Sequence, residues 1–258
     1  MEMLAGGVNV HYELTGSGEK RVALLHGWGC DTSLMKPVAD FLSRDMTVLA
    51  VDFPAHGKSG RPPEPWGVPE FAACTLELLK KQNFLPCSVI AHSFGGRITI
   101  ELASQDASLF ERLILTGSAG IKDRPSEEGR KRSARYQKLK GLCEKAKAMK
   151  VFGKLPDALE ERLRRKYGSK DYNALDPEMR KTFVKVVNHD QTDMLSSIRQ
   201  PTLLMWGDQD TETPMWMAQL MEERIPDAGL VTLEGGSHFA YLEQVGRFNA
   251  IAHNFLIE

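Results

Sequence analysis

The sequence has few of the features that mark secreted, membrane or metal-binding proteins. It contains only four cysteines in 258 residues, and Cys30, Cys74, Cys87 and Cys143 show neither CxxC spacing nor the density of a disulfide scaffold. No stretch approaches the roughly 18 consecutive apolar residues that a membrane span needs. The N-terminus also lacks the basic start and apolar run of a signal peptide. We therefore expect a cytoplasmic protein with free thiols, no metal site, no cofactor and no membrane contact.

An excess of one charge sign is also missing from the chain as a whole, whose formal net charge is −1. The distribution is uneven, because residues 122–166 carry 16 Lys or Arg against 7 Asp or Glu. Solvated faces of amphipathic surface helices require such residues, and an anionic substrate or partner is the alternative. No nucleic-acid-binding motif accompanies this charge, so nucleic acid is not an expected partner.

Short apolar runs bounded by glycine, proline or acidic residues recur along the chain, with helix-compatible segments between them. This alternation predicts an α/β fold with a mainly parallel, twisted, eight-stranded sheet flanked by helices. Several runs are apolar throughout, as expected for strands covered on both faces. Seven strands are located by their runs, at 8–14, 22–27, 46–52, 87–92, 112–117, 202–207 and 230–235. The expected helices lie at 33–43, 69–82, 95–104, 214–224 and 242–256.

The alternation breaks once, after the run LILTGSAGI at 113–121. The following residues, 122–197, are rich in Lys, Arg, Glu and Leu and too numerous for a structureless loop in a compact domain. We expect them to form a helical lid over the carboxyl edge of the sheet, where ligands bind in open α/β folds. Residues 1–121 and 198–258 would then form the core domain.

The most specific local pattern is VIAHSFGG at 89–96, an apolar strand that runs into Ser93 and then into a helix. A serine on a sharp strand-to-helix turn needs small residues two positions away on either side, and Ala91 and Gly95 meet that need. Such a turn lifts the hydroxyl above the sheet and places the backbone NH of Phe94 at a helix N-terminus, which favours an oxyanion. Ser93 is therefore the candidate nucleophile.

To act as a nucleophile, a serine hydroxyl needs a general base that accepts its proton, and this base needs a carboxylate that orients it. His238 follows the last expected strand within a glycine-rich turn at the edge that also carries Ser93. Asp208 and Asp210 both follow the strand at 202–207, and they compete for the role of the acid. Asp210 is favoured because it has the reach towards His238, whereas Asp208 lies close enough to the strand to brace the turn.

The remaining histidines have simpler expected roles. His26 could brace the loop that follows it, His56 lies in a turn, and His92 precedes the serine and should point elsewhere. His11, His189 and His253 are expected to be structural or surface residues.

A second oxyanion donor is expected from the loop after the strand at 22–27, where Gly27 permits a turn and Trp28 offers its backbone NH. The indole of Trp28 either walls the acyl pocket or packs as an ordinary hydrophobic side chain.

Taken in order, these motifs resemble the α/β-hydrolase fold superfamily. The matching segments are HGWG at 26–29, DFPAHGKS at 52–59, the serine turn at 91–95, WG followed by Asp210 and Pro214, and GSH at 236–238. The resemblance covers nearly the whole chain and extends to the order Ser, Asp, His and to a cap inserted after the sixth strand. Because HGWG is similar to the esterase and haloperoxidase-like branch, the resemblance implies a carboxylic ester hydrolase that acts on a small-molecule ester through an acyl-enzyme.

Three alternatives remain open at this stage. The segment SFGGR at 93–97 also resembles the menaquinone-pathway synthase of this fold, in which Arg97 would bind an anionic substrate. Carbon-carbon bond hydrolases share the triad. A non-catalytic ligand receptor is the alternative of another class, although all three triad positions are filled here. The acyl group, the alcohol and the oligomeric state are not encoded in any readable pattern.

Overall fold

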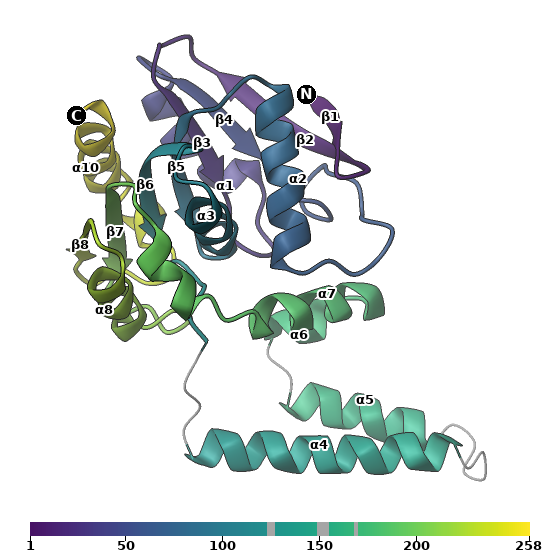
Figure 1. The fold of residues 1–258 in the computed structure, drawn as a ribbon. Helices are drawn as coiled ribbons and strands as arrows, with labels where there is room; N and C mark the ends of the chain where they lie inside the picture. Colours follow the sequence, from purple (N-terminus) through teal and green to yellow (C-terminus); the bar gives the residue numbers. More distant parts are fainter. Residues whose placement is uncertain (123–126, 149–154, 168–169) are drawn as a thin grey trace. The chain divides into compact units, whose positions relative to one another are not determined.

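The computed structural model describes the 258-residue chain except for residues 123–126, 149–154 and 168–169. It divides into two compact units, shown in Figure 1. The first consists of Met1–Lys122 and Lys185–Glu258, and the second is Asp123–Val184. The first unit contains the sheet, and the second contains most of the inserted helices.

The first unit is built on one eight-stranded sheet with the order β1-β2-β4-β3-β5-β6-β7-β8. The pairs β1·β2 and β2·β4 are antiparallel, and all other pairs are parallel. The α/β fold predicted from the sequence is confirmed. The strands are β1 (Glu2–Ala5), β2 (Val8–Thr15), β3 (Arg21–Leu25), β4 (Thr47–Val51), β5 (Cys87–His92), β6 (Phe110–Thr116), β7 (Thr202–Gly207) and β8 (Ala228–Leu233).

Helices cover both faces of this sheet (Figure 1). Side chains of α2, α3 and α8 pack on one face, and side chains of α1 and α10 pack on the other. The helices of this unit are α1 (Thr32–Leu42), α2 (Val68–Lys81), α3 (Phe94–Gln105), α8 (Met215–Arg224), α9 (Ala240–Glu243) and α10 (Val245–Ile257), with a short 3-10 helix η1 (Thr192–Ser197).

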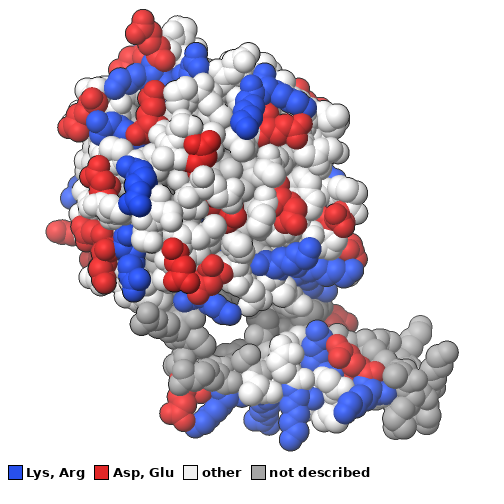
Figure 2. Space-filling model, in the orientation of Figure 1, with Lys and Arg blue, Asp and Glu red and all other residues white. Residues whose placement is uncertain are grey.

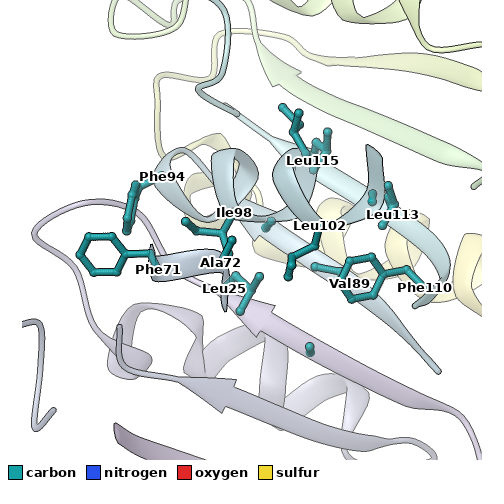
Figure 3. Close-up of a cluster of buried hydrophobic side chains, with 14 of the residues drawn as sticks. Leu25, Phe71, Ala72, Val89, Phe94, Ile98, Leu102, Phe110, Leu113 and Leu115 are labelled. Atoms are coloured by element: carbon teal, nitrogen blue, oxygen red, sulfur yellow. The ribbon is translucent and has the colours of Figure 1, made fainter. Parts of the chain in front are cut away.

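The central strands have buried side chains on both faces because each face lies under helices. Along β5, Val89 and Ala91 belong to the cluster beneath α2 and α3, and Ile90 belongs to the opposite cluster. All three are fully buried, which explains the continuous apolar run in the sequence. Figure 3 shows part of the first cluster, in which Phe94 of α3 lies beside Phe71 of α2.

The sequence missed one strand and one helix break. β1 is a four-residue antiparallel edge strand, Glu2–Ala5, that is too short to show an alternating pattern. The segment expected as one helix at 242–256 is two helices, α9 and α10, separated at Gln244.

The chain inserted after β6 is helical where the structure describes it. Its helices are α4 (Glu127–Ala148), α5 (Leu155–Tyr167), α6 (Lys170–Ala174) and α7 (Pro177–Asn188), and α7 ends in the first unit. Tyr136 of α4 and Tyr167 of α5 have ring centroids 5.6 Å apart, and Cys143 and Leu163 are buried. The second unit, at 123–184, is shorter than the lid expected at 122–197, because residues 185–197 group with the sheet.

The two ends of the insertion are held together on the first unit. The backbone NH of Gln191 donates to the carbonyl of Gly120 over 2.8 Å. The Gln191 amide also donates to the backbone carbonyl of Arg97 and to Oε2 of Glu101, both on α3. The chain therefore leaves and re-enters the sheet domain beside α3.

Within the part of the chain that the structure describes, no helix combines the length and the apolar character needed to cross a bilayer. The same residues contain no group of three or more His, Cys, Asp or Glu side chains arranged to hold a metal ion.

Candidate active site

Ser93 occupies a strained turn between the end of β5 and the start of α3. Its backbone has φ 49° and ψ −106°, and residues other than glycine rarely adopt such a positive φ. Its NH donates to the carbonyl of Thr116 over 3.2 Å, and its carbonyl accepts from the NH groups of Gly96 and Ala119, each over 3.0 Å. These contacts hold a conformation that would otherwise relax, and strain of this kind concentrates at functional sites.

The glycines after Ser93 are required by close packing of α3. A Cβ added to Gly95 would collide with the backbone carbonyl of Leu25 on β3, and one added to Gly96 would collide with Oγ of Ser118. The crowding inferred from the sequence pattern therefore has a specific source, because the first turn of α3 lies directly on β3 and on the loop after β6.

His238 and Asp210 form a hydrogen-bonded pair. Nδ1 of His238 lies 2.8 Å from Oδ2 of Asp210, whose carboxylate is 1% exposed. A carboxylate accepts hydrogen bonds, so Nδ1 carries the proton and Nε2 of the neutral ring keeps a free lone pair. This is the tautomer that a general base requires.

The carboxylate of Asp210 also accepts three bonds from its own loop. Oδ1 accepts from the backbone NH groups of Glu212 and Thr213, and Oδ2 accepts from the Thr213 hydroxyl over 2.8 Å. Burial acts to raise the pKa of Asp210, but the hydrogen bonds from His238 and Thr213 outweigh it and lower the pKa below its usual value. Sequence reasoning missed Thr213, because nothing distinguishes it from other threonines in loops.

The lowered pKa of Asp210 predicts a pH-dependent contribution to stability. The contribution is present above the pKa of an unfolded aspartate, about 3.9, and is lost as pH falls through the lower folded value. The free energy of unfolding of the wild type should therefore fall more steeply on acidification than that of Asp210→Asn. Urea titrations of both proteins from neutral to acidic pH measure this difference. Parallel curves would contradict the stabilised carboxylate.

Gly117, which follows β6, lies where the three candidate residues converge. A Cβ at Gly117 would lie 3.2 Å from Nδ1 of His238 and 3.3 Å from Oδ2 of Asp210. The preceding residue, Thr116, accepts the hydrogen bond from the NH of Ser93. All three residues therefore lie at the carboxyl edge of the sheet. No hydrogen bond joins the Ser93 hydroxyl to His238 among the described residues, and such bonds are often long before substrate binds.

Asp208, the competitor of Asp210, contacts a different group. Its Oδ1 accepts from the backbone NH of Gly235 over 2.7 Å, which ties the loop after β7 to the turn after β8.

The loop expected to supply an oxyanion donor runs beside Ser93. The carbonyl of His26 accepts from the NH of Gly95 over 3.0 Å, and a Cβ at Gly27 would lie 3.4 Å from Cβ of Ser93. The indole of Trp28 packs edge-on against the rings of His56 and Phe94. α3 begins at Phe94, one residue before the helix expected at 95–104, so the NH of Phe94 lies at the helix N-terminus as predicted. The use of the Trp28 and Phe94 NH groups as an oxyanion hole stays a prediction.

His26 braces this loop. Its Nδ1–H donates to the carbonyl of Gly27 over 2.7 Å, and its Nε2 accepts from the NH of Phe53 over 3.0 Å. Full burial, with a smaller effect of His56, lowers the pKa of His26 to about 4, so the ring is neutral at physiological pH. A neutral ring is needed here, because one nitrogen donates and the other accepts.

The expectation that His92 points away from the site is wrong. It is 1% exposed, and its Nε2 lies 2.9 Å from the backbone carbonyl oxygen of His238. Its ring centroid is 4.7 Å from that of His238. The only sequence signal for this contact is the position of His92 directly before the nucleophile.

Arg97 is buried on α3, with 7% of its surface exposed. Its guanidinium donates to the backbone carbonyl of His189 over 2.6 Å. His189 in turn contacts Glu101 over 2.9 Å, so these contacts join α3 to the chain that returns from the insertion. The structure thus gives Arg97 a structural contact, and binding of an anionic substrate by this residue stays a prediction.

Comparison with known proteins agrees with this architecture. A curated relative, the pimeloyl-[acyl-carrier protein] methyl ester esterase of Neisseria meningitidis serogroup A, is 27% identical over 253 residues, which cover 92% of this chain and 77% of the relative. Two solved structures share the fold: an enol-lactonase from Burkholderia xenovorans LB400 (TM-score 0.76, 20% identity, 100% of both chains), and an esterase from Exiguobacterium antarcticum (TM-score 0.75, 22% identity, 100% of this chain and 99% of that one). Residues 22–251 match the model of the alpha/beta hydrolase family. This chain therefore belongs to the alpha/beta hydrolase family, as its motifs predicted.

Proposed function

We propose that this hydrolase cleaves carboxylic esters through an acyl-enzyme formed on Ser93. The observation that carries the proposal is the His238–Asp210 pair, 2.8 Å long, at the edge of the sheet where Ser93 is held in a left-handed turn. A serine, an imidazole with its Nε2 lone pair free and a buried carboxylate are the groups that acyl transfer requires. The esterase named among the relatives supports the same reaction class.

In the proposed reaction, the Ser93 hydroxyl attacks the ester carbonyl while Nε2 of His238 accepts its proton. The backbone NH groups of Trp28 and Phe94 stabilise the oxyanion that forms. The alcohol leaves with the proton from His238, and a water molecule activated in the same way then releases the acid. Asp210 keeps His238 in the required tautomer and stabilises the imidazolium.

A covalent probe and a burst experiment test this proposal together. A fluorophosphonate should label Ser93, identified by peptide mass spectrometry, and a short-chain p-nitrophenyl ester should give a pre-steady-state burst of about one equivalent of p-nitrophenol. Labelling at another residue, or no labelling in folded protein, would refute the assignment of Ser93.

A substrate presented on an acidic carrier protein is a second candidate, favoured by the charge of the insertion. Residues 122–166 carry nine more Lys or Arg than Asp or Glu. On α4, Lys131 pairs with Glu127 and Lys140 pairs with Glu144 of the same helix; Lys131 is exposed and Lys140 is half-buried. Figure 2 shows the basic side chains that gather on the helices of the insertion. The relative from Neisseria meningitidis acts, by its name, on an ester attached to acyl-carrier protein.

Salt dependence distinguishes this candidate from a simple esterase. If the insertion binds an acidic carrier, kcat/KM for a carrier-linked methyl ester should fall as salt rises, while kcat/KM for the free methyl ester changes little. Lys131→Glu with Lys140→Glu should weaken turnover of the carrier ester alone. Equal salt dependence for the two substrates would exclude carrier recognition.

Removal of the Thr213 hydroxyl tests how the acid is positioned. In Thr213→Val the carboxylate of Asp210 loses one donor, so its pKa rises and its hold on His238 loosens. A hydrogen bond to a charged group contributes about 1.5–3 kcal/mol, and we expect kcat to fall by about 10-fold or more with little change in KM. Thr213→Ser keeps the hydroxyl and should retain most of the wild-type kcat. Equal rates in Thr213→Val and the wild type would contradict this role.

A further inference from the structure

His92 connects the strand that carries the nucleophile to the loop that carries the general base. It is the last residue of β5, directly before Ser93, and its Nε2 contacts the backbone carbonyl of His238 over 2.9 Å. Its ring lies against three rings of the loop and helix after β8, with centroid distances of 4.7 Å to His238, 5.0 Å to Phe239 and 4.9 Å to Tyr241. A small rotation of this one side chain would therefore displace the His238 backbone.

The contacts of His92 fix its tautomer. A carbonyl oxygen can only accept, so Nε2 of His92 must carry the proton that it donates to His238. Nδ1 is buried and has no hydrogen-bond partner among the described residues. A proton at Nδ1 would thus be a buried donor without an acceptor, which costs free energy. The ring is held as the neutral Nε2–H form.

The third side of the ring faces the loop that is expected to supply an oxyanion donor. A Cβ at Gly27 would lie 2.8 Å from Nδ1 of His92 and 3.4 Å from Cβ of Ser93. Any side chain at position 27 would push against His92 or Ser93. The His92 ring therefore lies between Ser93, the loop that carries His238 and the loop after β3, and it sets the distances between them.

We propose that His92 is a positioning residue, whose neutral Nε2–H bond to the carbonyl of His238 sets the place of the catalytic imidazole relative to Ser93. The inference rests on the ester hydrolase function proposed above. His92 itself exchanges no proton with the substrate, because its Nδ1 is enclosed and its Nε2 is bonded to backbone.

A neutral ring at this place also suits the charge that forms during the reaction. When His238 accepts the serine proton it becomes a cation, and a second cation with a ring centroid 4.7 Å away would oppose that step. Burial, and then the charge of His238, lower the pKa of His92 to about 3. Among the residues that the structure describes, the other titratable groups near the ring are Asp210, His26 and Tyr241.

A pair of amide substitutions separates the hydrogen bond from the volume of the ring. The glutamine amide nitrogen is as many bonds from Cα as Nε2 of histidine, whereas the asparagine amide nitrogen corresponds to Nδ1. His92→Asn should lower kcat for a p-nitrophenyl ester by about 10- to 100-fold, with KM within about twofold of the wild type. His92→Gln should recover most of that loss. The control is His253→Asn, which changes a histidine of α10 that pairs with Asp45. Its kcat should match that of the wild type.

Nitrogen NMR of the wild-type protein, with histidine labelled by ¹⁵N, provides a second and independent measurement. It should report a neutral Nε2–H ring for His92 across the pH range of activity. Titration of His92 within that range would overturn the proposal, and so would equal activity of folded His92→Asn and His92→Gln. Loss of the ester hydrolase function itself would show differently, as absent turnover and absent probe labelling in the wild type.

Discussion

Replacing Ser93 with alanine is expected to lower kcat for a short-chain ester by roughly 10⁶-fold, the scale seen when a triad serine is removed. Without the hydroxyl no acyl-enzyme forms, and only the oxyanion donors and substrate binding remain. The fold should survive, because the turn is held by backbone bonds to Thr116, Gly96 and Ala119 that alanine keeps. Stopped-flow assays should show the burst lost, and circular dichroism should show an unchanged fold.

Ser88→Ala is the matched control for this change. Ser88 is a buried serine on the same strand, β5, with 3% of its surface exposed. The control should keep the wild-type burst and kcat. If Ser93→Ala retained most of its activity while Ser88→Ala lost it, the nucleophile would have to be sought elsewhere.

Asp210→Asn is expected to lower kcat by about 10⁴-fold, as in the serine protease from which the triad is best known. An asparagine amide can present an NH group to Nδ1 of His238, which favours the tautomer that protonates Nε2. That ring cannot accept a proton from Ser93. Because asparagine has nearly the shape of aspartate, the loop that holds residue 210 should stay folded.

Asp208→Asn is the control that tests the choice between the two acids. The carbonyl oxygen of asparagine can still accept from the NH of Gly235, which is the contact of Asp208. Its kcat should therefore stay close to that of the wild type. The opposite order of the two variants, with Asp208→Asn the more damaged, would make Asp208 the orienting acid. Steady-state kinetics with one ester and one buffer suffice to decide.

The sequence predicted the sheet well because both faces of its central strands lie under helices. Val89, Ile90 and Ala91 are all fully buried, so the run stands out without any alternation. β1 was missed for the opposite reason, because Glu2–Ala5 is a short edge strand with exposed residues. Chain order and turn chemistry predicted that Ser93, Asp210 and His238 lie at one edge, since the carboxyl ends of parallel strands share it, and the structure brings them together there. Their catalytic roles stay a prediction.

The finer contacts of the site could not be predicted in the same way. His92 reaches a backbone carbonyl 146 positions further along the chain. A bond to backbone places no demand on the type of the residue that accepts it, so it leaves no pattern in the sequence. Thr213 is similar, because only the folded loop brings its hydroxyl to Asp210.

The close contact of Gly95 with the backbone carbonyl of Leu25 limits which residues position 95 can hold. One methyl group added at position 95 would push the first turn of α3 away from β3, so this position tolerates no residue larger than glycine. The chain between β6 and β7, by contrast, has its two ends held beside α3 by the bond from the NH of Gln191 to the carbonyl of Gly120. We therefore expect substitutions at position 95 to disturb the serine turn, and changes within the inserted chain to leave that turn in place.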